Sequence, residues 1–128
     1  MIKNYKKFFE GKKKFPNLKK IEADGYLIYV GKDSQSNDHL TFNMADDDDI
    51  WMHVKGSPGS HVVVKSKGKL PTNEILRYAA ELAKQNSKAK GEDKAPVVYC
   101  KRRFVKKEKG MNPGQVKVDY VNAYEIVV

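Results

Sequence analysis

The segment DDDDIWMHVKGSPGSH, Asp46 to His61, predicts the central hairpin of the fold. From Ile50 to Lys55, apolar residues alternate with Trp, His and Lys, a pattern typical of a strand whose two faces meet different surroundings. The residues GSPGS (56–60) break this strand because glycine and proline favour turns, and HVVVKSK supplies the returning strand. If the two strands pair symmetrically about the turn, His53 and His61 lie opposite each other on one face of the sheet.

Further strand-like runs flank this hairpin. LKKIEADGYLIYVG places two apolar-rich runs around Asp24-Gly25, a dipeptide that tolerates the positive φ angles of a tight turn, and so predicts a second hairpin. APVVYCKRRFVKKEKG and QVKVDYVNAYEIVV predict strands joined by a polar loop around Pro113-Gly114. The lone Cys100 falls in the first of these runs, where we expect a small buried core residue. A single cysteine forms no intramolecular disulfide, which fits a reducing cytoplasm.

Helices complete the predicted fold. Apolar residues from Ile2 to Phe9 recur at helical spacing, in a basic N-terminal lead-in that covers residues 1–20 and includes the run Lys12–Lys14. Asn37 is expected to cap a short helix that ends at the aspartates. Thr72 is expected to cap one long helix, which Gly91 would end. The buried stripe of this helix is expected to be Ile75, Leu76, Ala79, Ala80, Leu82 and Ala83.

These elements predict a single α+β domain over residues 1–128. We expect two layers, with a mostly antiparallel sheet of hairpins packed by the long helix plus short helices.

The charge of the chain favours a polyanionic partner. Its 25 Lys+Arg against 16 Asp+Glu give a net charge of +9, which attracts polyanions through the summed field. Nucleic acid fits best, because cations that neutralise phosphates release condensed counterions. No stretch approaches the roughly 18 apolar residues of a membrane span, and the N-terminus lacks the apolar core of a signal peptide. We therefore expect a cytoplasmic protein without a membrane partner.

The four consecutive aspartates do not predict a metal site. A calcium loop alternates its ligands around a central glycine, and Asp46–Asp49 does neither. The expected structure is a solvated helix-to-strand turn whose charge offsets nearby lysines. With Asp49, the histidines His53 and His61 could in principle ligate zinc, but the chain has no Cys-x-x-Cys or His-Glu-x-x-His spacing. No G-x-S-x-G elbow surrounds Ser57 or Ser60 either, so neither a metal nor another cofactor is predicted.

A nucleic-acid surface accounts better for the residues of this hairpin. An aromatic ring, imidazoles and cations would share one face, and this mixture suits stacked bases and phosphates. The residues concerned are Trp51, His53, Lys55, His61 and Lys65. The glycine-rich turn adds backbone N–H groups that can cup an anion. A second basic run, Lys101–Lys109, agrees with this interpretation, although a lysine-rich edge strand that resists aggregation would look the same. In a strand, Lys101 and Arg103 would share a face.

Several motifs, in this order, resemble one known family. They are VGKDSQSNDHLT (Val30–Thr41), DIWMHVKGSPGSHVVV (Asp49–Val64), AKQNSKAK (Ala83–Lys90), YCKRRFVKK (Tyr99–Lys107) and MNPGQV (Met111–Val116). Together they resemble the NFACT-R domain, the RNA-binding module of ribosome-quality-control proteins, over about residues 23–128. The family usually has Gly-Arg-Asn where this chain has Gly31-Lys32-Asp33, so a phosphate contact there would be weaker. The other NFACT domains do not fit in this length, so the chain resembles a stand-alone form and C-terminal tailing activity is not carried over.

The resemblance implies a module without chemistry of its own that recognises structured RNA. tRNA and ribosomal RNA are the expected ligands and the ribosomal large subunit a further partner, in translation, ribosome quality control or RNA modification. The predicted RNA-binding residues are Lys32, Asn37, Trp51, His53, Lys55, Gly59, Ser60, His61, Lys101, Arg103, Lys106 and Lys107. Trp51 is expected to stack on a base if its ring lies outside the core, and His61 is expected at the turn edge with little packing.

Two other functions stay open at this point. One is an enzyme acting on RNA or a nucleotide, with His53 and His61 as acid and base, because histidine titrates near neutrality. The other is a protein-interaction module on a ribosomal or modification complex.

Overall fold

A six-stranded antiparallel sheet forms the centre of the molecule, in the order β1-β2-β4-β3-β5-β8. The computed structural model describes residues 14–128, so the predicted N-terminal helix and the lysines Lys12 and Lys13 lie outside the described residues. The strands of the sheet are β1 Leu18–Ala23, β2 Tyr26–Gly31, β3 Ile50–Val54, β4 Val62–Lys65, β5 Pro96–Lys101 and β8 Tyr124–Val127. A separate two-stranded ribbon consists of β6 Val105–Lys106 and β7 Lys117–Val118.

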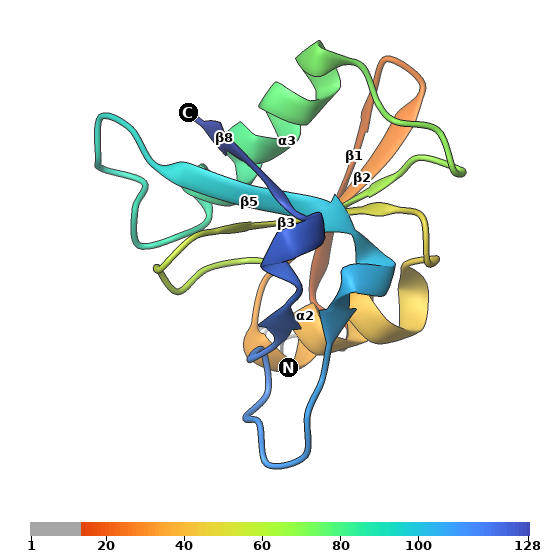
Figure 1. Ribbon diagram of the computed structural model, residues 1–128, viewed down its shortest axis with the longest axis vertical. Coiled ribbons are helices and arrows are strands. Elements are labelled where there is room, and N and C mark those ends of the chain that lie inside the picture. The colour runs from red at the N-terminus through yellow and green to blue at the C-terminus, as the bar shows by residue number, and fades with distance from the viewer. Residues whose placement is uncertain (1–13) are drawn as a thin grey trace, which may run out of the picture.

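The helices lie on both sides of this sheet. α3, Asn73–Gln85, covers one face, and α2, Ser34–His39, lies on the other with the π-helical turn η1, Leu40–Met44, as Figure 1 shows. Short 3-10 turns, η2 Arg102–Phe104 and η3 Tyr120–Asn122, interrupt the C-terminal half. The predicted α+β class, with an antiparallel sheet and one principal helix, is confirmed. Among residues 14–128, no helix is both long and apolar enough to cross a membrane.

Both predicted hairpins are present. Asp24 and Gly25, with φ angles of 49° and 82°, form the turn between β1 and β2. β3 pairs with β4 so that Trp51 lies opposite Val63. When this register is continued toward the turn, His53 comes opposite His61, and the two imidazole rings lie 5.6 Å apart. The predicted pairing of the two histidines is therefore confirmed.

Strand β3 separates two hydrophobic clusters because its side chains alternate between the faces of the sheet. Ile50, Met52 and Val54 join the larger cluster, which packs under α3. Trp51 belongs to the smaller cluster on the opposite face, together with Leu40, Val63, Val98, Cys100 and Val105. Cys100 is buried, as predicted, and this burial, with a smaller effect from the charge of Asp119, raises the pKa of its thiol to about 12.

The two helix predictions differ from the structure at their ends. Asn37 is not a cap: α2 begins at Ser34, and the Asp33 side chain caps it by accepting a hydrogen bond from the Ser36 N–H at 2.8 Å. Asp and Asn are both good N-cap residues, so the sequence pattern alone does not distinguish Asp33 from Asn37, one turn later. Thr72 caps α3 as predicted, and the expected apolar stripe faces the sheet.

Gly91, in contrast, does not end α3. The helix stops at Gln85 because Asn86 folds back, its side-chain amide donating to the Leu82 carbonyl at 2.8 Å.

The basic run after β5 does not continue as a strand. The chain leaves the sheet at Lys101 and turns through η2, so Lys101 and Arg103 do not share the face of one strand as predicted. The reason lies in the aspartate turn, whose backbone carbonyls accept the N–H groups of this segment: Arg102 donates to Asp49 at 2.8 Å and Arg103 to Asp47 at 3.0 Å. The last predicted strand is likewise divided, into β7, η3 and β8.

The aspartates form the predicted helix-to-strand turn, but one of them is buried. Asp49 is 1% exposed, and its carboxylate accepts the N–H groups of Asp46 at 2.8 Å and Ser66 at 3.1 Å. The Lys65 ammonium lies 2.6 Å from the same carboxylate. Asp49 is thus a structural anion that ties the start of β3 to the end of β4.

Removing this buried anion should destabilise the fold. We expect Asp49→Ala to lower the free energy of unfolding by about 3 kcal/mol, because it leaves two backbone donors without their acceptor and removes the nearer of the two carboxylates that pair with Lys65. Asp47→Ala is the matched control: its side chain is 68% exposed and pairs only with Arg102, so the loss should stay below about 1 kcal/mol. Urea unfolding of both variants measures the difference, and equal losses would contradict this role of Asp49.

Candidate nucleic-acid interface

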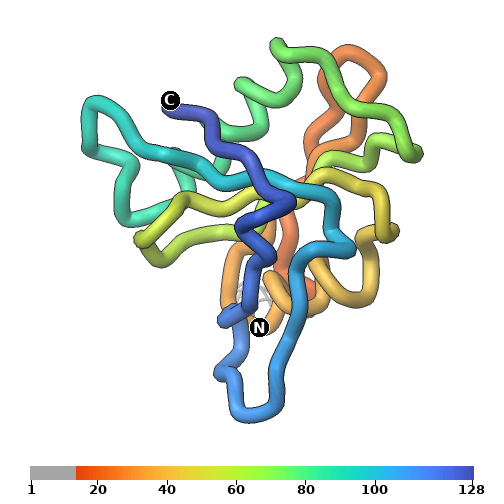
Figure 2. The backbone as a smooth tube through the Cα atoms, in the orientation of Figure 1, coloured from red at the N-terminus to blue at the C-terminus, as the bar shows by residue number. Residues whose placement is uncertain are grey.

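A pocket of about 600 Å³ lies on the face of the sheet opposite α3. Its walls come from segments far apart in the sequence: α2, β3, the turn 56–60, the loop between β6 and β7, and η3. The backbone of that loop is the long blue excursion at the bottom of Figure 2. The predicted residues that line the pocket are Asn37, Trp51, His53, Lys55, Gly59 and His61.

His61 holds two walls of the pocket together. Its Nε2 lies 3.1 Å from the carbonyl oxygen of Gly114, in the loop, and its Nδ1 lies 2.8 Å from the Thr41 hydroxyl, in η1. Because a carbonyl only accepts, Nε2 carries the proton, and Nδ1 then accepts from Thr41. Burial, and to a lesser extent the neighbouring His53, lowers the pKa of His61 to about 4. The imidazole is therefore neutral at pH 7.

A second set of contacts fixes the same loop. The Gly114 N–H donates to the Asp38 carboxylate at 3.1 Å, and the Lys107 ammonium, 2.9 Å from that carboxylate, donates to the carbonyls of Asn112 at 2.6 Å and Gln115 at 2.8 Å. Gly114 has a φ of 84°, a conformation that favours glycine. The loop is thus held in one conformation beside α2.

The glycine-rich turn forms the opposite rim. Gly59 packs so closely on Ser87, the second residue after α3, that an added Cβ would lie 2.5 Å from the Ser87 Cβ. Asn37 supports the turn from the other side, where its side-chain oxygen accepts the His61 N–H at 3.0 Å. Ser60, 8% exposed, donates its N–H to the Asn86 carbonyl at 3.0 Å and does not line the pocket.

The imidazoles and the indole form one ring cluster on this face, as the alternation predicted. The Trp51 ring lies 6.0 Å from His53 and 5.2 Å from His61. The expectation of an open face at these positions is wrong, because Trp51 and His61 are each only 1% exposed beneath the loop and α2. His61 is a packed core residue, and His53 is the more accessible imidazole. Burial also lowers the pKa of His53, against an opposing backbone hydrogen bond with Gly59.

This geometry does not favour acid–base catalysis by the two histidines. Both ring nitrogens of His61 are engaged and its pKa lies far below neutrality, whereas a general base needs a free nitrogen and a pKa near the working pH. Within residues 14–128, no group of three or more His, Cys, Asp or Glu side chains is placed to hold a metal ion.

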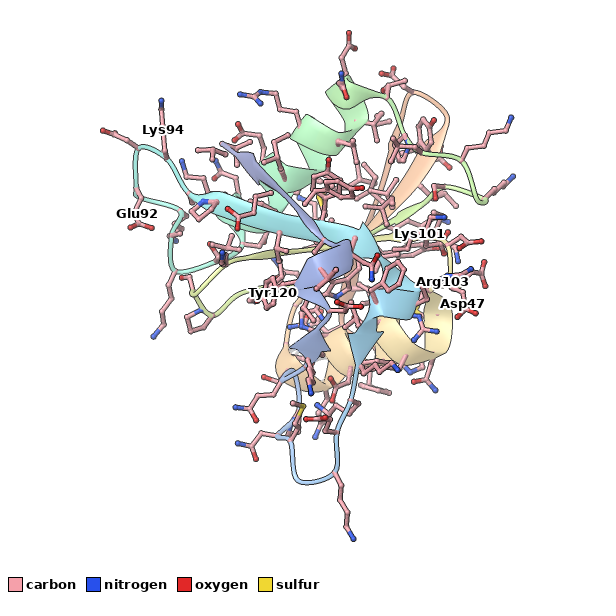
Figure 3. All side chains as sticks on the ribbon, in the orientation of Figure 1. Asp47, Glu92, Lys94, Lys101, Arg103 and Tyr120 are labelled. Atoms are coloured by element: carbon pink, nitrogen blue, oxygen red, sulfur yellow. The ribbon has the colours of Figure 1, made fainter. Side chains whose placement is uncertain are left out.

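The predicted basic residues fall into different settings. Lys32 donates to the Asn86 side chain at 2.8 Å, close to the rim. Lys101 and Arg103 both pair with Asp48 of the acidic turn. Figure 3 labels both residues and the neighbouring Asp47. Lys106 is exposed on the β6–β7 ribbon, whereas Lys107 supports the loop. The pocket therefore gathers the hairpin residues, and the basic run lies beside it.

Sequence reasoning missed part of this site. Tyr120 lines the pocket with 58% of its surface exposed, and Lys55 lies 5.7 Å from the centre of its ring. Met111, Pro113 and Gly114 line it from the loop. The Asn-Pro-Gly turn was visible in the sequence, but its position over β3 depends on Asp38, Lys107 and His61, which are distant along the chain.

Comparison with known proteins places the fold in a family. The sequence model of the family described as NFACT protein RNA binding domain matches residues 14–120. The chain belongs to this family. The match includes every residue that lines the pocket, so the pocket lies within the NFACT-R domain.

Relatives of this NFACT-R domain are larger proteins. "Rqc2 homolog RqcH" of Bacillus subtilis is 44% identical over 105 residues, which are 81% of this chain and 18% of that protein. "Coiled-coil domain-containing protein 25" of Bos taurus is 32% identical over 102 residues, 75% of this chain and 48% of that protein. The solved C-terminal structure of the fibronectin/fibrinogen-binding protein from Streptococcus suis has a TM-score of 0.81 and 35% identity, covering 91% of this chain and 46% of that one. The chain thus spans less than half of each.

The neutral state of His61 should make stability depend on pH. A pKa that is lower in the folded than in the unfolded chain contributes stability above about pH 6.5, which is lost as the pH falls toward 4. We expect the free energy of unfolding to fall by about 2 kcal/mol between pH 7 and pH 5 from this residue alone. His61→Gln, whose amide does not titrate, should lack this part of the loss. Urea unfolding at both pH values tests it, and the same pH dependence in both proteins would contradict it.

Because Gly59 lies so close to Ser87, any side chain at position 59 should destabilise the fold. Gly59→Ala should cost about 1–3 kcal/mol of stability, because the added methyl group forces the turn away from the end of α3. Gly91→Ala is the matched control, since its Cβ would meet nothing within 4 Å. Thermal unfolding compares the two variants, and equal melting temperatures would refute the close packing of the rim.

Proposed function

We propose that this NFACT-R domain is an RNA-binding module that recognises structured RNA and performs no chemistry of its own. The observation that carries the proposal is a preformed pocket with an exposed tyrosine at its edge, flanked by exposed cations, in a chain of net charge +9 from a family described as RNA binding. Aromatic rings beside cations are the groups that contact bases and phosphates.

A line of cations extends from the pocket across neighbouring grooves. Tyr120 borders the pocket and two further hollows. Lys55 lies on one side of it, and Arg103, Lys106 and Lys117 line the hollow on the other. A phosphate backbone that crosses Tyr120 would therefore meet positive charge on both sides.

The carboxylates near these cations do not prevent phosphate binding. Lys55 pairs with Glu125 and Lys117 with Glu108, and all four side chains are at least 43% exposed. Exposed ion pairs contribute only about 0–1 kcal/mol, so a phosphate can replace the carboxylate at little cost. Lys107 is excluded from this exchange in our proposal because the Asp38 carboxylate of α2 and two loop carbonyls occupy its ammonium.

The proposed ligands are tRNA or ribosomal RNA, and the proposed setting is ribosome quality control or a related step of translation in the cytoplasm. The support is the resemblance to proteins named Rqc2 homologs, of which this chain spans 18% in the Bacillus subtilis case. Contact with the ribosomal large subunit is part of the same proposal.

RNA binding should be steep in salt. We expect log Kd for tRNA to rise linearly with log salt concentration between roughly 50 and 200 mM, because each neutralised phosphate releases condensed counterions. Replacing Arg103 and Lys106 together by alanine should lower the slope by roughly 1.4–1.8, the sum for two phosphate contacts. Fluorescence anisotropy with labelled tRNA measures both slopes.

The matched control replaces Lys90 and Lys94, which removes the same charge. Figure 3 shows Lys94 at the opposite end of the molecule from Arg103. This variant should keep the wild-type slope. A flat salt response of the wild type would overturn the proposed function, and equal slopes of the two double variants would overturn the proposed path.

A further inference from the structure

We propose that the pocket beside β3 holds a single unstacked nucleobase of the bound RNA, with its phosphate at the Lys55 edge. This inference rests on the proposed RNA binding and names what the pocket itself takes. It assigns a base-recognition site that is distinct from the cations contacting the backbone.

The size and walls of the pocket fit one base. Its volume of about 600 Å³ lies within the range of about 300–1,000 Å³ that is common for small-molecule sites. Apolar groups of Val98, Met111 and Pro113 line it together with the rings of His53 and Tyr120. Flat aromatic ligands gain from stacking on such rings whatever the base, because every base has a π-face.

The wall also contains a polar group that lacks a partner. The indole N–H of Trp51 is buried, and no acceptor among residues 14–128 lies within hydrogen-bond distance. Buried donors are nearly always hydrogen-bonded, so an orphan in the wall of a pocket is a sign of a missing acceptor. Carbonyl oxygens and ring nitrogens of a base are acceptors of the required kind, and they would reach this N–H only after a small shift of the side chains over it, because the indole has almost no exposed surface.

Two further groups are available at the same place. The Ser57 hydroxyl has no hydrogen-bond partner among the described residues. His53 presents an imidazole whose pKa is lowered by burial; one ring nitrogen faces the Gly59 backbone, which leaves the other as an acceptor for a base. Such a group suits the edge of a neutral base better than a phosphate.

The phosphate of the same nucleotide has its own contacts. Lys55 lines the mouth with a side chain that is 47% exposed. Gly56 has a φ of 72° in the turn beside it, and its backbone N–H donates to no protein acceptor among the described residues. Backbone N–H groups in a glycine-rich turn can contribute to a concave anion site. The base would thus point inward and the charge would stay at the rim.

The rigid walls explain why the base must be unstacked. The loop is fixed by His61, Asp38 and Lys107, and the turn by Asn37 and Ser87. A paired base must first give up its pairing and stacking to enter a recess between the two loops, whereas a base in a bulge or loop already has its edges free. The pocket therefore selects bulges and loops of structured RNA.

Mononucleotides test the pocket without an RNA backbone. Trp51 is the only tryptophan of the chain and lies in the wall, so its fluorescence reports occupancy. Nucleoside 5′-monophosphates should change this fluorescence in a saturable manner, and ribose 5-phosphate, which has the phosphate but no base, should not. An equal response to both would show an anion site alone and overturn the base pocket.

Two hairpins then separate this inference from the proposed function. One carries a single bulged 2-aminopurine, and the other has the same stem fully paired. We expect the bulged hairpin to bind about tenfold more tightly, the lower part of the range for stacking one base, with a change in 2-aminopurine fluorescence. Tyr120→Ala should remove this preference, so that both hairpins bind with equal affinity. Tyr78→Ala, which removes a ring that is 41% exposed on α3, at the other face of the sheet, should keep the preference.

Each other outcome overturns one of the two proposals. Equal affinity for both hairpins, or a preference that survives in Tyr120→Ala, overturns the base pocket and leaves RNA binding in place. Binding to neither hairpin nor to tRNA overturns the proposed function and the base pocket with it.

Discussion

The register of β3 is the constraint on which the rest of the structure depends. Its side chains alternate, so Met52 and its neighbours complete the core under α3 while Trp51 and His53 face the opposite side. A shift of one residue would exchange the two sets and place imidazole against the alanines of α3. Buried Asp49 secures this register at one end through Ser66 and Lys65, and the pairing of His53 with His61 marks the other end.

The second face of the sheet shows how buried polar groups can shape a site. His61, Asn37 and Asp38 join the loop and the turn to α2 through hydrogen bonds that each use a specific atom. An apolar cluster could fill the same volume, but it would not hold Gly114 at a defined place, because apolar contacts have no direction. The neutral state of His61 is part of this arrangement, since a charged imidazole in that position would be strongly disfavoured.

Charge is distributed unevenly over the molecule. The aspartate turn accepts the backbone and side chains of the Lys101–Arg103 segment, so the most basic run of the sequence is the most closely paired. Of the cations around Tyr120, Lys55 and Lys117 have exposed carboxylate partners and remain exchangeable. Counting charges along the sequence therefore identifies the kind of partner better than the place where that partner binds.

The sequence by itself determined the two hairpins, the long helix and the central pairing. Period-two alternation, the Asp24-Gly25 turn and the Thr72 cap are local signals, and each depends on neighbours within a few residues. It also placed His53 and His61 together, because the symmetry of a hairpin follows from its turn. Only the tertiary structure decided that Trp51 and His61 are buried and that the Asn112–Gln115 turn and Tyr120 complete the pocket. These facts depend on contacts such as His61 with Gly114, which are 53 residues apart in the chain, and no local pattern specifies such a contact.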